Sequence, residues 1–427
     1  MKLYKKYSLF YILFIMLLTA SCSNELNLFP EESIDPSQLT ASDLPQLING
    51  VYNKSTIGIG NRFIDFDLLA HHFEATPLFA GDDVNYIRNR LNPTQTESWW
   101  IELYEAIFSA NLALEVIDNL EGDFKTEEAT ALYFRALSYY YLVTRFGGVP
   151  LISKNTTEIV QRGTIDSTWD FIISDLTNAL PLADDFSNQN FVSKEAIQAL
   201  LARVYIATGN HSEALIMAEN VISSSSGQFS LATDFASIFS INGNKEVIFS
   251  LGNTPVELVR QYVVFNPNDH PISGSQQFAP TDIIFNQLFS DQDLRKNASI
   301  TTFNSQNIVN KYSESRNMPV VVSRMAEMYL ISAEAQGFPS GMARLNQLRN
   351  IRGLASHTTI TGQEGFIDAI LDERQKEFYA EGFYWYDLVR TNKALERLEN
   401  VTEQNQLLLP IPQREIDLTG IKQNPGY

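Results

Sequence analysis

Several side chains that could bind a small polar ligand gather in residues 79–90, a stretch without helical periodicity. The stretch mixes aromatic rings with carboxylate, amide and guanidinium groups, a combination that can stack on a sugar ring and hydrogen-bond its hydroxyls. A second irregular stretch, residues 252–281, contains a further tyrosine. We predict a ligand site from these stretches and a nearby tryptophan: Asp83, Asn85, Tyr86, Arg88, Trp99 and Tyr262. The alternative is that residues 79–90 form a solvated loop.

Trp99 and Trp100 begin an amphipathic stretch and have different expected roles. Trp100 lies on the apolar stripe that continues through Leu103 and Ile107, so we expect it in the core. Trp99 lies about 100° further round the helix, so its indole could either face solvent or pack inside. An exposed indole would offer a flat apolar face with a hydrogen-bond donor at its edge.

Three carboxylates near the C-terminus have the spacing of a possible catalytic pair. Glu373, Glu377 and Glu381 are four residues apart, so they share one face of a helix. Two acids within reach of each other are what glycoside hydrolysis requires. Here they alternate with Arg374 and Lys376, and we therefore interpret them as carboxylates held in structural ion pairs.

Other signals of catalysis or of metal binding are absent from the sequence. It contains no His-Glu-x-x-His, Gly-x-Ser-x-Gly, P-loop or Gly-x-Gly-x-x-Gly motif. The adjacent His71 and His72 would diverge on a helix, and a single cysteine excludes an internal disulfide or a thiolate cluster. We predict a binding protein with no catalytic residues, no metal and no cofactor.

The N-terminus has the features of an exported lipoprotein. Three lysines precede an unbroken apolar run at residues 9–18, which is too short to span a bilayer. Small residues then lead to the only cysteine, Cys22. We predict a lipoprotein signal peptide over residues 1–21, lipidation of Cys22 and a flexible tether over residues 22–36, with an ordinary signal peptide as the alternative.

The charge of the chain restricts its partners. The net charge is −19, and loss of the leader with its three lysines would lower it to −22. Such an acidic surface repels phosphate backbones, which excludes nucleic acid as a partner.

Helical periodicity dominates the remainder of the chain. Apolar residues at three- and four-residue spacing predict helices near residues 97–117, 126–145 and 166–180. A further set has the order and spacing of a tetratricopeptide repeat: Leu201, Ala202, Tyr205, Gly209, Asn210, Ala214 and Ala218. One repeat cannot bury its apolar face alone, so other helices must stack on it. The expected neighbours are helices over residues 126–145, 324–336 and 342–352.

Irregular stretches and short β-like runs separate these helices. Proline and glycine interrupt residues 252–281, and β-like runs occur at residues 247–251 and 308–312. We predict one mostly α domain over residues 37–427, built of stacked tetratricopeptide helix pairs with long irregular loops and a few short β-hairpins. Its N-terminal part covers about 37–225 and its C-terminal part about 226–427.

Seven segments, in order along the chain, resemble the SusD/RagB family of nutrient-uptake lipoproteins of the outer membrane. The segments are WIELYEAIFSAN (100–111), FRALSYYYLVTRFGGVPL (134–151), SKEAIQALLARVYIATGN (193–210), RMAEMYLISAEA (324–335), RLNQLRNIRG (344–353), DERQKEFYAEGFYWYDLVR (372–390), and the tail LLLPIPQREI (407–416) with QNPGY (423–427).

The resemblance implies a SusD-like fold and a surface-exposed, lipid-anchored protein of the cell outer membrane. Such a protein captures a nutrient, usually an oligosaccharide and sometimes a peptide, and delivers it to a SusC-like TonB-dependent transporter without acting as an enzyme. Three alternatives stay open: an oligopeptide-binding member of the same family, a surface glycoside hydrolase, and a tetratricopeptide adaptor that binds only proteins.

Overall fold

The computed structural model describes residues 36–60, 62, 64–79, 84–224, 228–242, 244–252, 264–315 and 318–427. The predicted leader, Cys22 and all of the predicted tether except residue 36 lie outside these residues. Asp83 and Tyr262 lie outside them as well.

Helices form most of the described chain. The α-helices are α2 (Leu44–Gly60), α3 (Asp65–Leu69), α4 (Val84–Ile87), α5 (Glu97–Asp118), α6 (Lys125–Phe146), α7 (Ile165–Ala179), α8 (Lys194–Ala207), α9 (His211–Ile222), α10 (Asp282–Gln287), α11 (Lys296–Ser299), α12 (Met325–Gln336), α13 (Met342–Ile351), α14 (Gly362–Glu377), α15 (Tyr384–Arg390), α16 (Ala394–Arg397) and α17 (Gln413–Thr419). Short 3-10 helices are η1 (Pro36–Gln38), η2 (Ala236–Phe239) and η4 (Gln404–Leu407). None of the helices in the described residues is both long and apolar enough to cross a bilayer.

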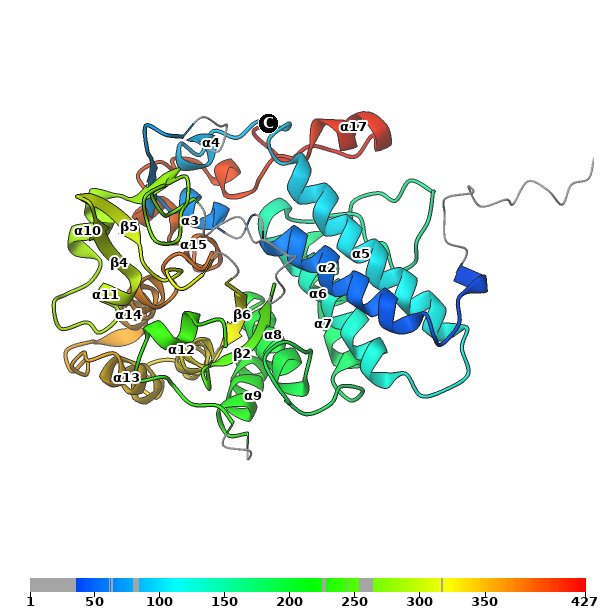
Figure 1. Cartoon of the computed structure of the whole chain (residues 1–427), viewed down its shortest axis with the longest axis horizontal. Helices are drawn as coiled ribbons and strands as arrows, with labels where there is room; N and C mark the ends of the chain where they lie inside the picture. The colour runs from blue at the N-terminus through cyan, green and yellow to red at the C-terminus, as the bar shows by residue number, and fades with distance from the viewer. Residues whose placement is uncertain are drawn as a thin grey trace, which may run out of the picture.

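The long helices stack on one another, as the sequence predicts. α5, α6 and α7 pack side by side, and α2 lies against α5 and α6 (Figure 1). α8 and α9 form the predicted tetratricopeptide pair, and α12 packs on both of them. α13 follows α12, and its Arg344 pairs with Glu219 of α9. α6 contacts α8, so the expected neighbours over residues 126–145, 324–336 and 342–352 all contact this pair.

The corner of the α8–α9 pair depends on Gly209. Its φ angle is +76°, in the left-handed region that a side chain disfavours. The next residue, Asn210, donates its backbone N–H to the Tyr205 carbonyl at 2.8 Å, which closes the turn. Ala214 and Ala218 of α9 are fully buried, so small side chains let the two helices approach closely.

The strands form three two-stranded antiparallel sheets within the described residues. The strands are β1 (Phe73–Ala75), β2 (Val247–Leu251), β3 (Phe278–Pro280), β4 (Ile300–Phe303), β5 (Gln306–Val309) and β6 (Val320–Arg324). β4 and β5 form a hairpin, whereas β1–β3 and β2–β6 join strands that are far apart in sequence. The expectation of short hairpins thus holds for one pair only, because the other two pairs depend on long-range contacts.

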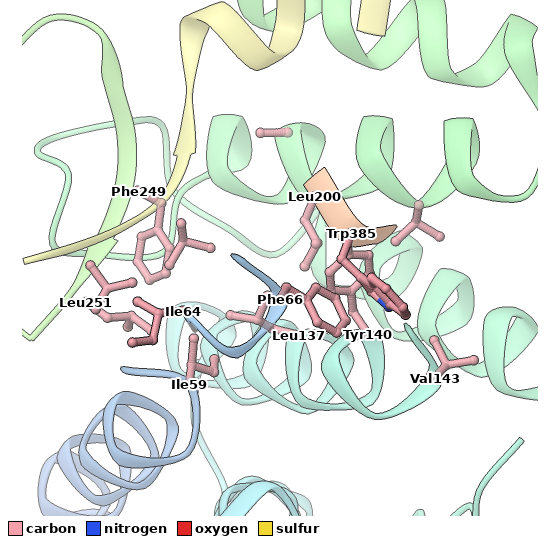
Figure 2. Packing of buried hydrophobic residues seen from close by; sticks show 14 of the residues in the cluster. Ile59, Ile64, Phe66, Leu137, Tyr140, Val143, Leu200, Phe249, Leu251 and Trp385 are labelled. Atoms are coloured by element: carbon pink, nitrogen blue, oxygen red, sulfur yellow. The ribbon is translucent and has the colours of Figure 1, made fainter. Parts of the chain in front are cut away.

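A continuous buried cluster joins the N-terminal and C-terminal helices. Figure 2 shows Phe66 of α3, Tyr140 of α6 and Trp385 of α15 within this cluster. Phe249 and Leu251 of β2 belong to it as well, so the sheet β2–β6 is anchored to the helices. The core therefore fixes the positions of α2, α6 and β2 relative to one another, and these three elements form walls of the site described next.

Candidate functional site

Trp99 lies in the core, so the prediction that it contacts a ligand is wrong. The side chain is 0% exposed, and its indole N–H donates to Asp65 Oδ2 at 2.7 Å. The centre of its ring lies 3.9 Å from the guanidinium carbon of Arg145. Helix α5 is covered by both α2 and α6, so burial extends further round it than the stripe through Trp100. Because Asp65 accepts the single polar hydrogen, the whole indole is buried without an unpaired donor.

Helix α4 carries two of the other predicted residues, Asn85 and Tyr86, and Arg88 directly follows it; the prediction for Tyr86 is also wrong. Tyr86 is 1% exposed and its hydroxyl donates to the Gln95 carbonyl at 3.4 Å, so its ring is not available for stacking on a ligand. A one-turn helix must bury its apolar ring to be held in place, and this explains the difference from the prediction. Asn85 is half-buried and Arg88 is exposed. Of the predicted set, only Asn85 and Arg88 lie at the surface of the described chain.

The carboxylates of Glu373, Glu377 and Glu381 are buried in ion pairs, as predicted from their alternation with basic residues. Glu377 contacts three guanidinium groups, those of Arg324 at 2.6 Å, Arg352 at 2.7 Å and Arg295 at 2.9 Å. We call the set to which it belongs the Glu377 network: Glu246, Glu373, Glu377 and Glu381 with Arg295, Arg324, Arg352 and Lys311.

The electrostatics of this network are unsuited to acid catalysis. Burial would raise the pKa of Glu377, but the charges of Arg352, Arg324 and Arg295 outweigh burial and hold that pKa well below its ordinary value. A glycosidase acid needs the opposite, a carboxyl whose pKa is raised so that it carries a proton. Elsewhere in the described residues, no three His, Cys, Asp or Glu side chains converge as a metal site would require.

A hollow of about 800 Å³ lies between α2, the start of α6, the connection from α7 to α8, and the end of β2. We call it the α2–α6 groove. Its lining residues are Ile48, Asn49, Tyr52, Thr56, Thr126, Glu127, Thr130, Asp184, Asp185, Ser187, Asn190, Phe191, Val192, Ser250, Leu251 and Gly252. This volume is in the range of pockets that bind small molecules.

The surface of the groove combines one exposed ring with many hydrogen-bonding groups. Phe191 is 57% exposed, which is unusual for a phenylalanine that also lines a hollow. Carboxylates of Asp184 and Asp185 are exposed nearby, and the amide of Asn190 is half-buried. The groove can therefore offer an apolar face and several polar contacts to one ligand.

The loop that carries Phe191 is fixed at several points along its length. The backbone N–H of Phe186 donates to Glu195 at 2.9 Å, and the N–H of Val192 donates to the Tyr52 hydroxyl at 3.0 Å. The Gln189 carbonyl accepts the Ser250 N–H at 2.9 Å, which ties the loop to β2. Ordered loops on a rigid scaffold commonly carry binding residues, because their backbone is held in a defined position.

Tyr52 and Ser250 add polar groups to the wall and floor of the groove. Burial raises the pKa of Tyr52 to about 12, so the phenol is neutral at physiological pH. Ser250 is 2% exposed, and its hydroxyl has no hydrogen-bond partner in the described part of the chain. A buried hydroxyl without a partner is costly unless a water or ligand completes it.

Sequence reasoning missed this groove because its walls come from four separate segments. Only residues 184–191 carried a usable signal, a polar run that contains two phenylalanines and precedes the helix-capping Ser193. Phe191 ends this run, and the five residues before it give no helical or strand periodicity that would place its ring in the core.

Comparison with known proteins establishes the family. Residues 36–206 match the family SusD-like_3, described as starch-binding and associating with the outer membrane, and residues 282–406 match the SusD family, SusD_RagB. The chain belongs to the SusD/RagB family. SusD-like protein P38 of Formosa agariphila is 26% identical, and the alignment covers 100% of both chains. SusD-like protein P2 of the same organism is 25% identical over 99% of this chain and 100% of the relative.

Solved structures share the SusD-like fold. A SusD superfamily protein from Parabacteroides distasonis is 24% identical with a TM-score of 0.80, covering 91% of this chain and 100% of the other. A laminarin-binding SusD-like protein is 23% identical with the same TM-score and coverage. Surface glycan-binding protein A from Bacteroides thetaiotaomicron, in complex with laminarihexaose, is 19% identical with a TM-score of 0.77 over 90% of this chain and 100% of its own. SusD-family glycan-binding proteins are non-catalytic.

Proposed function

We propose that this SusD/RagB protein binds a neutral oligosaccharide in the α2–α6 groove. The observation that carries the proposal is the exposed Phe191 ring beside amide, hydroxyl and carboxylate groups in a hollow of about 800 Å³. The apolar face of a pyranose ring can stack on the phenyl ring, while its hydroxyls exchange hydrogen bonds with side chains such as Asn190 and Asp184.

The charge of the groove favours a neutral ligand over an acidic one. Glu127, Asp184 and Asp185 line it, whereas none of its lining residues in the described part of the chain is a lysine or arginine. Lys194 lies nearby, but its ammonium is 2.8 Å from Asp185 and so is engaged. Uronic acids and sulfated sugars would meet like charge here. Laminarihexaose and xylogluco-oligosaccharide, present in two solved structures of similar fold, are neutral sugars.

The sequence-predicted residues supply a second contact surface in this proposal. Asn85 on α4 and Arg88 directly after it are accessible, and Asp83 directly precedes that helix in the sequence. Together with Tyr262 they would contact parts of a longer glycan outside the groove.

We further infer that the protein is anchored at Cys22 by lipid on the outer surface of the outer membrane. The leader pattern and the family description of association with the outer membrane support this location. There the protein would deliver its ligand to a SusC-like TonB-dependent transporter. Expression of Cys22→Ala beside the unaltered protein tests the anchor. Only the unaltered chain should incorporate labelled palmitate and copurify with the membrane fraction and the SusC-like transporter.

Isothermal titration of the purified protein tests the class of ligand. We expect saturable heat with neutral gluco-oligosaccharides such as laminarihexaose, and none with a sulfated or uronic oligosaccharide of similar length. Binding of an oligopeptide pool with no response to any glycan would replace this proposal by peptide uptake. A transporter complex that binds neither would indicate an adaptor, and release of reducing sugar would indicate a hydrolase.

A further inference from the structure

A small cavity of about 20 Å³ lies where α3, α6, α8, α12, α14 and α15 meet in the core. Phe66 and Tyr140, which Figure 2 shows in the buried cluster, line it together with four arginines. A volume of about 10–15 Å³ is sufficient for one water-sized guest, so the cavity can hold a single small species but no sugar, sulfate or phosphate.

Three of the four arginines are matched by carboxylates. Arg203 makes two hydrogen bonds of 2.6 Å to Glu327. Arg374 pairs with Asp387 at 2.6 Å, and Arg390 pairs with both Glu334 and Asp387. Glu381 also lines the cavity, but Arg324 and Lys311 of the Glu377 network engage it.

The fourth arginine, Arg145, has no such partner. It is 1% exposed, and no carboxylate oxygen in the described residues lies within 4.0 Å of its nitrogens. Asp65 favours its charge from a longer distance and accepts the indole N–H of Trp99. Burial lowers the pKa of Arg145 to about 10, so the guanidinium remains cationic at neutral pH.

The hydrogen-bonding edge of Arg145 is also incomplete. The rings of Phe66 and Trp99 cover the guanidinium at 3.8 and 3.9 Å, and Nη1 makes only long contacts, to the Tyr141 carbonyl at 3.4 Å and the Thr144 hydroxyl at 3.3 Å. Nε and Nη2 of Arg145 are buried without an acceptor in the described residues, and so is Nη1 of Arg374. Rings can stabilise the faces of a guanidinium, but its N–H groups still require acceptors.

We propose that this cavity binds one monovalent anion of about the size of chloride, held by the N–H groups of Arg145 and Arg374. An anion supplies both what the residues lack, an acceptor for charged donors and a compensating negative charge in a buried site. A water molecule would supply only the acceptor. The site is independent of oligosaccharide binding in the groove.

Bromide replacement tests the site directly. Crystals of the protein grown with sodium bromide as the only halide should show an anomalous peak in the cavity, within hydrogen-bonding distance of Arg145 and Arg374. Density without anomalous signal would identify a water molecule and overturn the proposal.

Thermal unfolding supplies a second, independent test. At constant ionic strength, with gluconate as the replaced anion, we expect the midpoint to rise by about 2 °C for each tenfold increase in chloride above its Kd. Arg145→Met should abolish this dependence, whereas Arg414→Met, at an exposed arginine outside the cavity, should retain it. Equal midpoints in chloride and gluconate would contradict the proposal whether or not Arg145→Met folds.

Discussion

The α2–α6 groove and the Glu377 network are both rich in carboxylates, but they differ in burial and in partners. In the groove, Asp184 and Asp185 are exposed, and an aromatic ring stands beside them. In the network, Glu373 and Glu377 are 0% exposed, and their carboxylate oxygens form ion pairs with arginines. The first set can exchange water for a ligand, whereas the second cannot release its partners without unfolding.

This difference shows that spacing alone does not assign a role to a carboxylate. Glu373 and Glu377 have the four-residue spacing that brings acids together, yet both serve to hold α14 against β6, α13 and the start of α11 through arginines. Asp184 and Asp185 are adjacent in a loop and belong to no motif. Burial and counter-charge, which depend on the tertiary fold, separate a structural acid from a binding one.

Glu377→Gln should produce the largest loss of stability. The substitution removes a charge that three buried guanidinium groups share, and it leaves them without full compensation. We expect the free energy of unfolding to fall by about 3–5 kcal/mol, measured by urea denaturation. Asp185→Asn is the matched control in the groove and should change stability by less than about 0.5 kcal/mol, because its partner Lys194 is a surface residue. A similarly small loss of unfolding free energy in both variants would show that the carboxylates of the Glu377 network are no more structural than those of the groove.

Trp99→Phe tests whether Trp99 belongs to the core or to the ligand site. Phenylalanine keeps most of the apolar packing but removes the indole donor to Asp65. We expect a loss of about 1–3 kcal/mol in unfolding free energy, with oligosaccharide affinity unchanged in titration calorimetry. Reduced oligosaccharide affinity in a fully folded Trp99→Phe protein would show that Trp99 takes part in ligand binding.

The acid sensitivity of unfolding should differ between Glu377→Gln and the unaltered protein. The pKa of Glu377 is held well below its ordinary value of 4.5 in the folded state. Its stabilising contribution is therefore complete above that ordinary value and is lost as pH falls through the lowered one. Stability measured against pH should decline less steeply below about 4.5 in Glu377→Gln than in the unaltered protein. Parallel curves would indicate that Glu377 is not strongly ion-paired.

The sequence predicts the helices well because the signals for them are local. Helix α7 begins and ends within one residue of its predicted bounds, since Thr164 caps its start and Pro181 follows its end. The α8–α9 corner is equally local, because it needs only Gly209 and small residues at fixed spacing. Strand β6, by contrast, is not predicted from the sequence, because its partner β2 lies some 70 residues away.

The site is harder to predict because exposure is a property of the whole fold. Trp99 and Trp100 are neighbours on one helix, and both are buried because α2 and α6 pack on that helix. Phe191 becomes a candidate ligand platform only once α2, α6 and β2 surround its loop. A sequence pattern can indicate residues suited to sugar binding, but it cannot tell which of them the core will cover.

Titration of Phe191→Ala with an oligosaccharide that binds the unaltered protein tests whether the α2–α6 groove is the ligand site. Phe108→Ala is the matched control, since Phe108 is 56% exposed, close to the 57% of Phe191, and does not line the groove. We predict that Phe191→Ala weakens binding by about 5–30-fold, which corresponds to about 1–2 kcal/mol of lost apolar contact, while Phe108→Ala binds as the unaltered protein does. Equal affinity in all three proteins would show that the oligosaccharide binds elsewhere.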